Sequence, residues 1–381
     1  MHPERFIKSS LILVLALTIR NEAVQAQAGA VRVFGWDLSE TVGSLEALDA
    51  NQASVRDEDG SSSNIMSSDI AFMEFIGSLS ASARSKAIEP GMLILNDGTR
   101  FTGWPESTSD ELLWLNWWCG TVEPDTDQIV SINRFDTKQP DTATSDDIVR
   151  LRNKDRVTGL VMGIGSIVTI DTSESTTLEI PIDRIDSIAL VNPVRESAGT
   201  IMWLPPGDKV RIEEYLYGPG TGLMTSGREP LQPGNILAIA PDANRIVPLS
   251  SCDSAVETLD DMIRYQLPEP EISSGNWSLD AAPIEIRGPL RVVWNLPERD
   301  MGFVATMTIP HQYRRLGSVD IVIRDGSRSV LEHTLDARNP SVDVAVNIRS
   351  DRLVMELDEG KSGPLQDVVR VDRGLLLRSS P

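Results

Sequence analysis

Short runs of alternating apolar and polar residues follow one another along most of this chain. The stretch from 147 to 192 shows the pattern best, with such runs at 148–151, 156–162, 167–170, 178–182 and 187–190. Five short runs within about 45 residues, separated by turn residues, predict the content of one small β-barrel. Gly159 lies inside the second run, where a glycine allows a bent strand to turn a barrel corner.

The same pattern recurs in the first two thirds of the chain. Each copy ends with an isoleucine followed three residues later by Met or Ile, and these pairs are Ile70/Met73, Ile129/Ile132, Ile185/Ile188 and Ile236/Ile239. The recurrence predicts four small barrel repeats, which span residues 31–76, 91–136, 147–192 and 200–243. Gly103 in the second copy and Gly43 in the first copy occupy the position that corresponds to Gly159. The fourth copy has Ile212 at this position.

In the order of their strands and turns, these copies resemble Sm-like and SH3-like small barrels. The resemblance implies four barrels in series that act as packed spacers or bind a protein partner. Sm-like barrels in other settings bind RNA. The formal net charge of −21 argues against that activity here, because a nucleic-acid surface must be cationic to replace counterions.

Three of the eight tryptophans lie within five residues of the second copy. In a strand, Trp114 and Trp118 face one side and Trp117 the other. We expect one face to fill a barrel core and the other to present a ring outward, against a neighbouring repeat or a ligand.

After the repeats, residues 253–276 read as a short helix and a linker. Val256, Leu259 and Ile263 have helical spacing and Asp253 is a candidate N-cap, which predicts a helix near 255–266.

From residue 277 to 379 the apolar and polar residues alternate over longer runs. Strands of this kind bury one face and expose the other, and without intervening helices they predict a β-sandwich. The order "GPLRVVWNLPERDMGFVATMTI", then "GSVDIVIRDGSRSVLEHTL", then "DVAVNIRSDRLVMELDEGKSGPLQDVVRVDRGLLL" resembles the novel carbohydrate-binding module (NPCBM) family of jelly-roll domains, often attached to secreted glycosidases. Asp367 falls on the aspartate of the family's closing motif, and Val371 stands where the family usually has tryptophan.

The first 28 residues have the order of a secretory signal peptide. Arg5 and Lys8 precede an apolar run at 11–19, which is too short to span a bilayer as a helix, and small residues end at Ala28. We expect cleavage and export to the periplasm, the cell envelope or the medium, with no membrane span in the mature chain. A retained N-terminal anchor is the alternative. Repeats followed by such a module also resemble uncharacterised exported proteins of planctomycete-type bacteria.

The chain offers little recognisable catalytic chemistry. Only His311 and His333 remain after residue 28, and the sequence has no nucleophile elbow, phosphate loop or zinc-protease motif. We therefore expect no metal and no cofactor. Cys119 and Cys252 either form a disulfide or remain separate thiols.

The candidate ligand-binding residues are Tyr313, Arg314 and Asp367. Tyr313 lies in a loop between strands, where an exposed ring could stack on a sugar, and Arg314 is beside it. Asp367 is expected to act mainly in folding, by accepting hydrogen bonds from backbone donors of the turn at 358–363.

The sequence favours a non-catalytic exported binding or scaffolding protein whose C-terminal module contacts glycan or cell-envelope polymer. The alternative is a hydrolase acting on polysaccharide, or a subunit of one, through a carboxylate pair that carries no motif.

Overall fold

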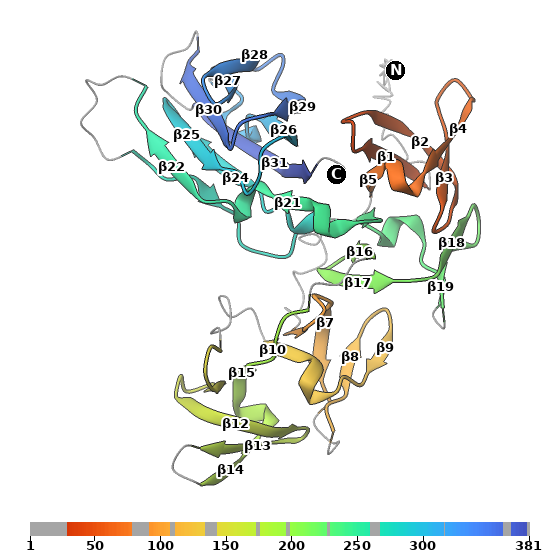
Figure 1. The fold of residues 1–381 in the computed structure, drawn as a ribbon, viewed down its shortest axis with the longest axis vertical. Helices are drawn as coiled ribbons and strands as arrows, with labels where there is room; N and C mark the ends of the chain where they lie inside the picture. The colour runs from red at the N-terminus through yellow and green to blue at the C-terminus, as the bar shows by residue number, and fades with distance from the viewer. Residues whose placement is uncertain are drawn as a thin grey trace, which may run out of the picture.

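The computed structural model shows an all-β protein, as the sequence predicts. Within the described ranges the regular structure consists of antiparallel strands and single-turn 3-10 helices (Figure 1). The expected signal peptide lies outside these ranges. The structure describes residues 29–77, 91–106, 111–133, 143–172, 176–195, 199–226, 229–259, 267–315, 317–360 and 367–378.

Four units of similar order occupy the first two thirds of the chain, and each has four strands, one turn of 3-10 helix and a final strand. Unit 1 contains β1 (Ala30–Gly35), β2 (Glu40–Leu48), β3 (Gln52–Arg56), β4 (Ser62–Met66), η1 (Ser67–Asp69) and β5 (Ile70–Phe75). Unit 2 contains β6 (Gly91–Leu95), β7 (Arg100–Pro105), β8 (Trp114–Asn116), β9 (Gly120–Val122), η2 (Thr126–Gln128) and β10 (Ile129–Asn133). Unit 3 contains β11 (Asp147–Leu151), β12 (Arg156–Ile164), β13 (Ile167–Thr172), β14 (Thr177–Pro181), η3 (Ile182–Arg184) and β15 (Ile185–Ala189). Unit 4 contains β16 (Thr200–Leu204), β17 (Asp208–Ile212), β18 (Tyr215–Gly218), β19 (Gly222–Thr225), η4 (Pro233–Asn235) and β20 (Ala238–Ala240).

The glycines matched between the units lie at close approaches of two strands. A side chain on Gly159 would collide with the backbone oxygen of Asp171, and one on Gly103 would collide with that of Leu115. Gly103 also has a φ of 155°, which few other residues adopt. In both units the matched position therefore requires a residue without a side chain.

The units are curved open sheets, and no closed barrel is found among the described strands, which corrects the sequence expectation. In each unit the first strand pairs with both the second and the last, as β11 does with β12 and β15. The outer edge of the last strand, which a closed barrel would use within the unit, pairs instead with another unit. Thus β10 pairs with β15, and β5 pairs with β20.

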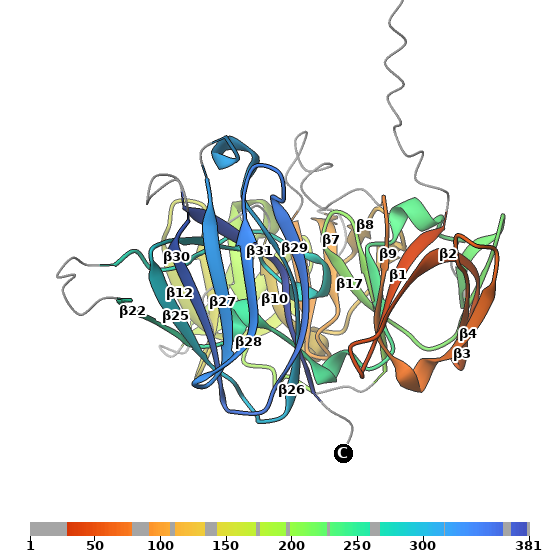
Figure 2. The ribbon, with the colours of Figure 1, turned by 90° about the horizontal axis from the view of Figure 1, so that it is seen from above.

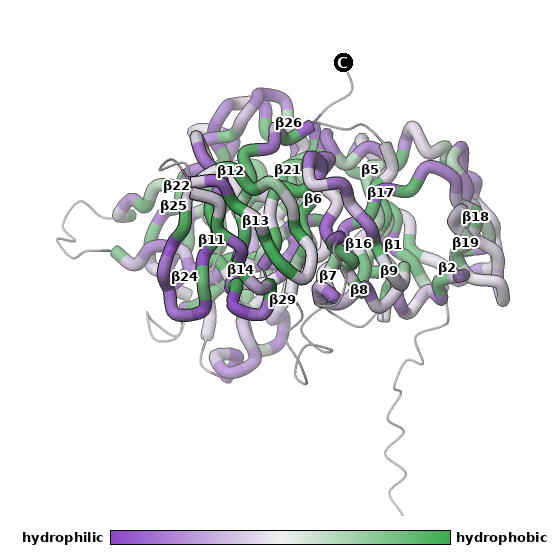
Figure 3. Tube along the Cα trace, turned by 90° about the horizontal axis from the view of Figure 1, so that it is seen from below, coloured by the Kyte–Doolittle hydropathy of each residue, from purple (hydrophilic) through white to green (hydrophobic). Residues whose placement is uncertain are grey.

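These contacts between units join equivalent residues. Ile132 lies opposite Ile188, and Met73 lies opposite Ile239, so the second residue of each recurring pair meets its counterpart. Each contact therefore has an approximate local twofold symmetry, and the pairing is nested, with unit 1 against unit 4 and unit 2 against unit 3. Further single bridges complete one 20-stranded sheet. Along it, apolar segments follow the strands and hydrophilic segments gather at turns (Figure 3).

The C-terminal part is the predicted β-sandwich of two antiparallel sheets (Figure 2). One sheet has β23 (Glu271–Ile272), β24 (Ile284–Arg287), β31 (Val368–Arg378), β26 (Met301–Thr308) and β29 (Ser341–Ile348) in this order, with β21 (Ile246–Pro248) also on β31. The other has the order β22 (Ser254–Glu257), β25 (Leu290–Asn295), β30 (Arg352–Glu359), β27 (Val319–Asp325) and β28 (Arg328–Leu335). The short 3-10 turns in and before this region are η5 (Ala243–Arg245), η6 (Leu249–Ser251), η7 (Ser278–Asp280) and η8 (His311–Tyr313). Trp294 and Phe303 are buried in the core between the sheets, as expected.

The helix predicted near 255–266 is wrong in its described part. Ser254–Glu257 forms strand β22, in which Val256 lies opposite Val292 of β25. Pairing with an open sheet edge satisfies the backbone of this segment and outweighs the helical spacing of its apolar residues. Residues 260–266 lie outside the described ranges. The sandwich thus includes three strands that precede residue 277.

An apolar core joins units 1 and 4 to the sandwich. Phe34 stacks on Phe72 at 4.7 Å between ring centroids, and both pack in one cluster with Trp203 and Leu375. At its edge the guanidinium of Arg373 lies 4.8 Å from the Phe34 ring centroid. The sandwich is therefore held on the repeats by buried apolar surface.

Two acidic side chains add polar contacts between unit 2 and unit 4. Asp280 binds Arg100 at 3.1 Å and Lys209 at 2.8 Å, and although burial opposes this, the two cations hold the pKa of Asp280 below its usual value. Asp208 of unit 4 is fully buried and accepts hydrogen bonds from the backbone and side chain of Thr102 and from Asn116, at 2.5–2.9 Å. Burial raises the pKa of Asp208 to about 6, against these hydrogen bonds, which favour the carboxylate.

We predict that Asp208→Ala destabilises the protein by about 3 kcal/mol, because it leaves buried donors of Thr102 and Asn116 without an acceptor. Chemical denaturation would measure the effect. The matched control is Asp183→Ala, which removes an exposed carboxylate from unit 3. Equal stability of the two variants would contradict the role assigned to Asp208.

Candidate functional site

The residues predicted from the sequence to bind ligand all lie in the sandwich. Tyr313 is half-buried and packs against the sandwich core, whereas the sequence predicted an exposed ring. Its carbonyl accepts a hydrogen bond from the Gly317 amide at 2.8 Å. Arg314 donates from Nε to the Ile309 carbonyl at 3.1 Å. Both residues therefore hold the loop that follows β26.

Asp367 is also buried, with 3% of its surface exposed. Burial raises the pKa of Asp367 to about 6, and the nearby carboxylates of Glu359, Asp320 and Asp358 add to the rise. The Ser318 amide offsets part of it, although among the described residues no hydrogen bond to either carboxyl oxygen meets ordinary distance and angle limits. The expected bonds to the closing turn are therefore not seen in the described part of that turn.

The two cysteines are thiols in different parts of the molecule, and no disulfide joins them. Cys119 belongs to unit 2, where its Sγ donates to Asn116 Oδ1 at 3.1 Å. Cys252 precedes β22 in the sandwich, and burial raises the pKa of its thiol.

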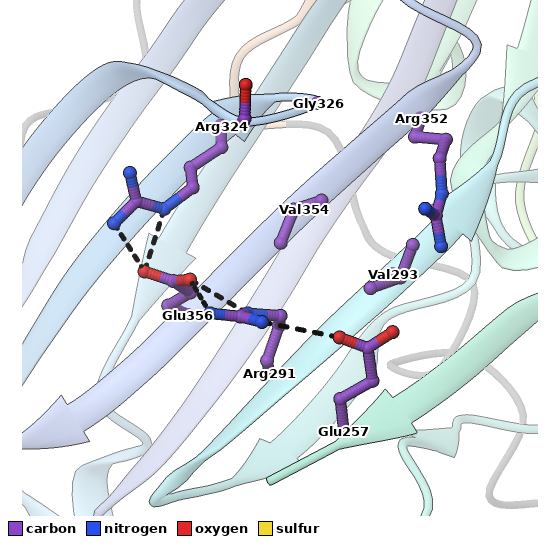
Figure 4. A pocket seen from close by; sticks show the side chains of 9 residues that line it. Glu257, Arg291, Val293, Arg324, Gly326, Arg352, Val354 and Glu356 are labelled. Carbon is purple, nitrogen blue, oxygen red and sulfur yellow. Dashed lines mark hydrogen bonds and ion pairs between the residues drawn. The ribbon is translucent and has the colours of Figure 1, made fainter. Parts of the chain in front are cut away.

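A different site lies on the outer face of the sheet formed by β22, β25, β30 and β27. This arginine depression has a volume of about 430 Å³ (Figure 4). Its walls are mostly charged and its floor is apolar. The residues that line it are Glu257, Arg291, Val293, Arg324, Gly326, Ser327, Arg352, Val354 and Glu356.

Glu356 fixes two of the three arginines. Arg291 contacts one of its carboxylate oxygens at 2.5 and 2.8 Å, and Arg324 contacts the other at 2.7 and 2.8 Å. Burial acts to raise the pKa of Glu356, but the two guanidinium groups outweigh it and hold this pKa below its usual value. Arg291 also lies 3.4 Å from Glu257. Glu356 is therefore a permanent anion that positions two cations.

The third arginine is differently placed. Arg352 is exposed, and in the described part of the chain no ion pair or side-chain hydrogen bond to its guanidinium is found. It lies beside Val293 and Val354, whose side chains form the apolar floor (Figure 4). Three arginines against two glutamates leave the depression with a surplus positive charge on a protein of net charge −21. The arrangement is suited to an anionic group with an apolar side.

Sequence reasoning missed these residues. They occupy outward positions of alternating strands, where charged residues are usually solvated. The register that places Arg291 of β25 opposite Glu356 of β30, with Arg324 of β27 on the far side, is set by long-range pairing. The available signal was that three neighbouring strands all carry outward arginines.

Comparison with known proteins gives a distant structural similarity. No family model and no curated protein sequence matches the chain. Among solved structures, the CBM51 of Clostridium perfringens GH95 in complex with methyl-galactose is 14% identical, with a TM-score of 0.29 over 34% of this chain and 99% of that one. The tandem CBM51 modules of a Streptococcus pneumoniae family 98 glycoside hydrolase are 8% identical, with a TM-score of 0.26 over 91% and 88% of the two chains. At this level no site residue is transferred.

The described ranges lack two further features. They contain no helix with the length and hydropathy needed to cross a membrane. In the same part of the chain, no three or more His, Cys, Asp or Glu side chains are grouped to hold a metal ion.

We predict that Asp367→Asn stabilises the protein at pH 7.5 and changes its stability little near pH 4. The pKa of Asp367 is raised in the folded state, so its favourable contribution is present below the unfolded pKa of about 4 and is lost as pH rises through about 6. Thermal unfolding at both pH values checks this, with the exposed Asp183→Asn as control. A variant that is less stable than the wild type at pH 7.5 would show that the carboxylate is needed.

Proposed function

We propose that this is an exported, non-catalytic binding or scaffolding protein whose C-terminal sandwich binds an acidic glycan or cell-envelope polymer at the arginine depression. The observation that carries the proposal is the exposed guanidinium of Arg352 beside two arginines that Glu356 holds in place. Export rests on the signal-like first 28 residues.

The chemistry favours a polymer with carboxylate or sulfate groups. A planar guanidinium binds such groups with two parallel hydrogen bonds, and fixed neighbours reduce the ordering cost. The valine floor offers apolar contact to the carbon face of a sugar ring. Because the rest of the protein is strongly acidic, a polyanion is attracted only where arginines are concentrated.

The arrangement disfavours hydrolysis at this site. A glycosidase needs one carboxyl group that is protonated near the working pH. Glu356 has a lowered pKa and is engaged by two arginines, so it cannot supply a proton there.

The repeats have a supporting role in this proposal. They are joined to each other and to the sandwich by paired strands and buried contacts. Such a framework spaces the sandwich from another attachment point or presents surface to a protein partner.

The test is binding of the mature full chain to polygalacturonate, a sulfated galactan and neutral xylan. We expect binding to one of the anionic polymers, weakened about tenfold or more by Arg352→Ala and partly retained by Arg352→Lys. The control is Arg338→Ala, which removes an exposed arginine from a loop outside the depression. Binding that is equal in all variants, or that is limited to xylan, would reject the site.

A further inference from the structure

Unit 2 carries a second surface that the depression does not involve. Two of the eight tryptophans, Trp104 and Trp117, are exposed, each to 40%. Leu115 is exposed to 41%. Trp104 of β7 lies directly opposite Leu115 of β8, which lies opposite Thr121 of β9, so the three share one face. Trp117 follows Leu115 by two residues and is exposed, as expected from the sequence, whereas Trp114 is buried.

The turn that presents Trp117 is fixed from beneath. Asn116 is buried and accepts hydrogen bonds from the Trp118 and Cys119 amides at 2.9 Å. The same side chain donates to the Thr102 carbonyl and to Asp208. The exposed indole of Trp117 therefore lies on an ordered turn, so ligand binding does not include the entropic cost of ordering that backbone.

The next row of the same face is acidic. The Glu106 amide bonds the Leu113 carbonyl at 2.7 Å, so Glu106 lies opposite Leu113, two residues from both Trp104 and Leu115. Trp114 lies opposite Val122, and the same register extended by one residue places Glu123 opposite Leu113, on the side away from Glu106. Residues two apart in a strand point to the same face at a spacing of about 7 Å. Two carboxylates thus lie in the row next to that of Trp104 and Leu115.

The charge of this surface selects its occupant. The segment from 101 to 128 contains six acidic residues and no Lys or Arg. Exposed indole faces attract a guanidinium or ammonium group through their π electrons, and neighbouring carboxylates strengthen that attraction. An anionic polymer is repelled. We infer that this surface, defined by Trp104, Leu115, Trp117, Glu106 and Glu123, binds an extended basic peptide segment of a protein partner.

The spacing agrees with such a segment. Alternate side chains of an extended chain lie about 7 Å apart on one side, which matches the distance between the row of Trp104 and Leu115 and the row of Glu106 and Glu123. One basic side chain then lies on an indole while the next reaches a carboxylate.

The test is titration of the full mature chain with a heptapeptide of alternating glycine and arginine, followed by tryptophan fluorescence and calorimetry. We expect Trp104→Ala and Trp117→Ala each to weaken binding about threefold or more, although neither changes the net charge. Glu123→Gln should also weaken it. Asp183→Asn, which removes the same charge from an exposed site in unit 3, should not.

Four outcomes overturn the inference. Equal binding by all variants shows attraction to overall charge only, and absence of binding rejects the peptide. Binding of neutral hydroxyethylcellulose that is lost in the tryptophan variants would assign the surface to sugar. Dimerisation in ultracentrifugation that is lost in the same variants would assign it to a second copy of this chain. Arg352 takes no part in any of these measurements, so they are independent of the proposed glycan binding.

Discussion

Backbone hydrogen bonds between the last strands of different units hold the repeat region together. β10 lies between β6 and β15, and β5 lies between β1 and β20, so each of these strands is bonded on both edges. An unpaired strand edge is a template for aggregation, and here another unit covers it. The nested order also brings the first unit against the fourth, beside the strands that lead into the sandwich. The position of the sandwich therefore depends on which units pair.

The two parts of the chain offer different chemistry to their surroundings. Among the described residues, the exposed large apolar side chains lie almost entirely in the repeats, and Ile272 is the exception. The outward face of the sandwich sheet carries arginines and glutamates instead. The two proposed ligands carry opposite charges, so electrostatic repulsion would keep each from the other surface.

Much of the fold follows from local sequence and much of the site does not. The recurring isoleucine pairs lie in or next to the last strand of each unit, and the glycine of the second strand in units 2 and 3 lies where two backbones approach closely. The contacts between units could not be predicted from the sequence, because no local pattern indicates that Ile132 lies opposite Ile188. Ser254–Glu257 was mispredicted for the same reason. Its apolar residues have helical spacing, but the segment forms a strand because it pairs with β25. The arginine depression depends on register across three strands, and register comes from pairing over long distances.

The joints between the parts differ in kind. Units 1 and 4 meet the sandwich through the cluster of Phe34, Phe72, Trp203 and Leu375, and apolar contact of this kind is strong but has little directional preference. Unit 2 pairs with unit 3 through β10 and β15, and it meets unit 4 through Asp208 and Asp280, whose hydrogen bonds and ion pairs require particular distances and angles. Burying the Asp208 carboxylate is unfavourable unless every partner is in place. The polar joint therefore contributes orientation more than stability. Asn116 belongs to this joint and also fixes the turn of Trp117, so one side chain links the tryptophan surface to the contact between units 2 and 4.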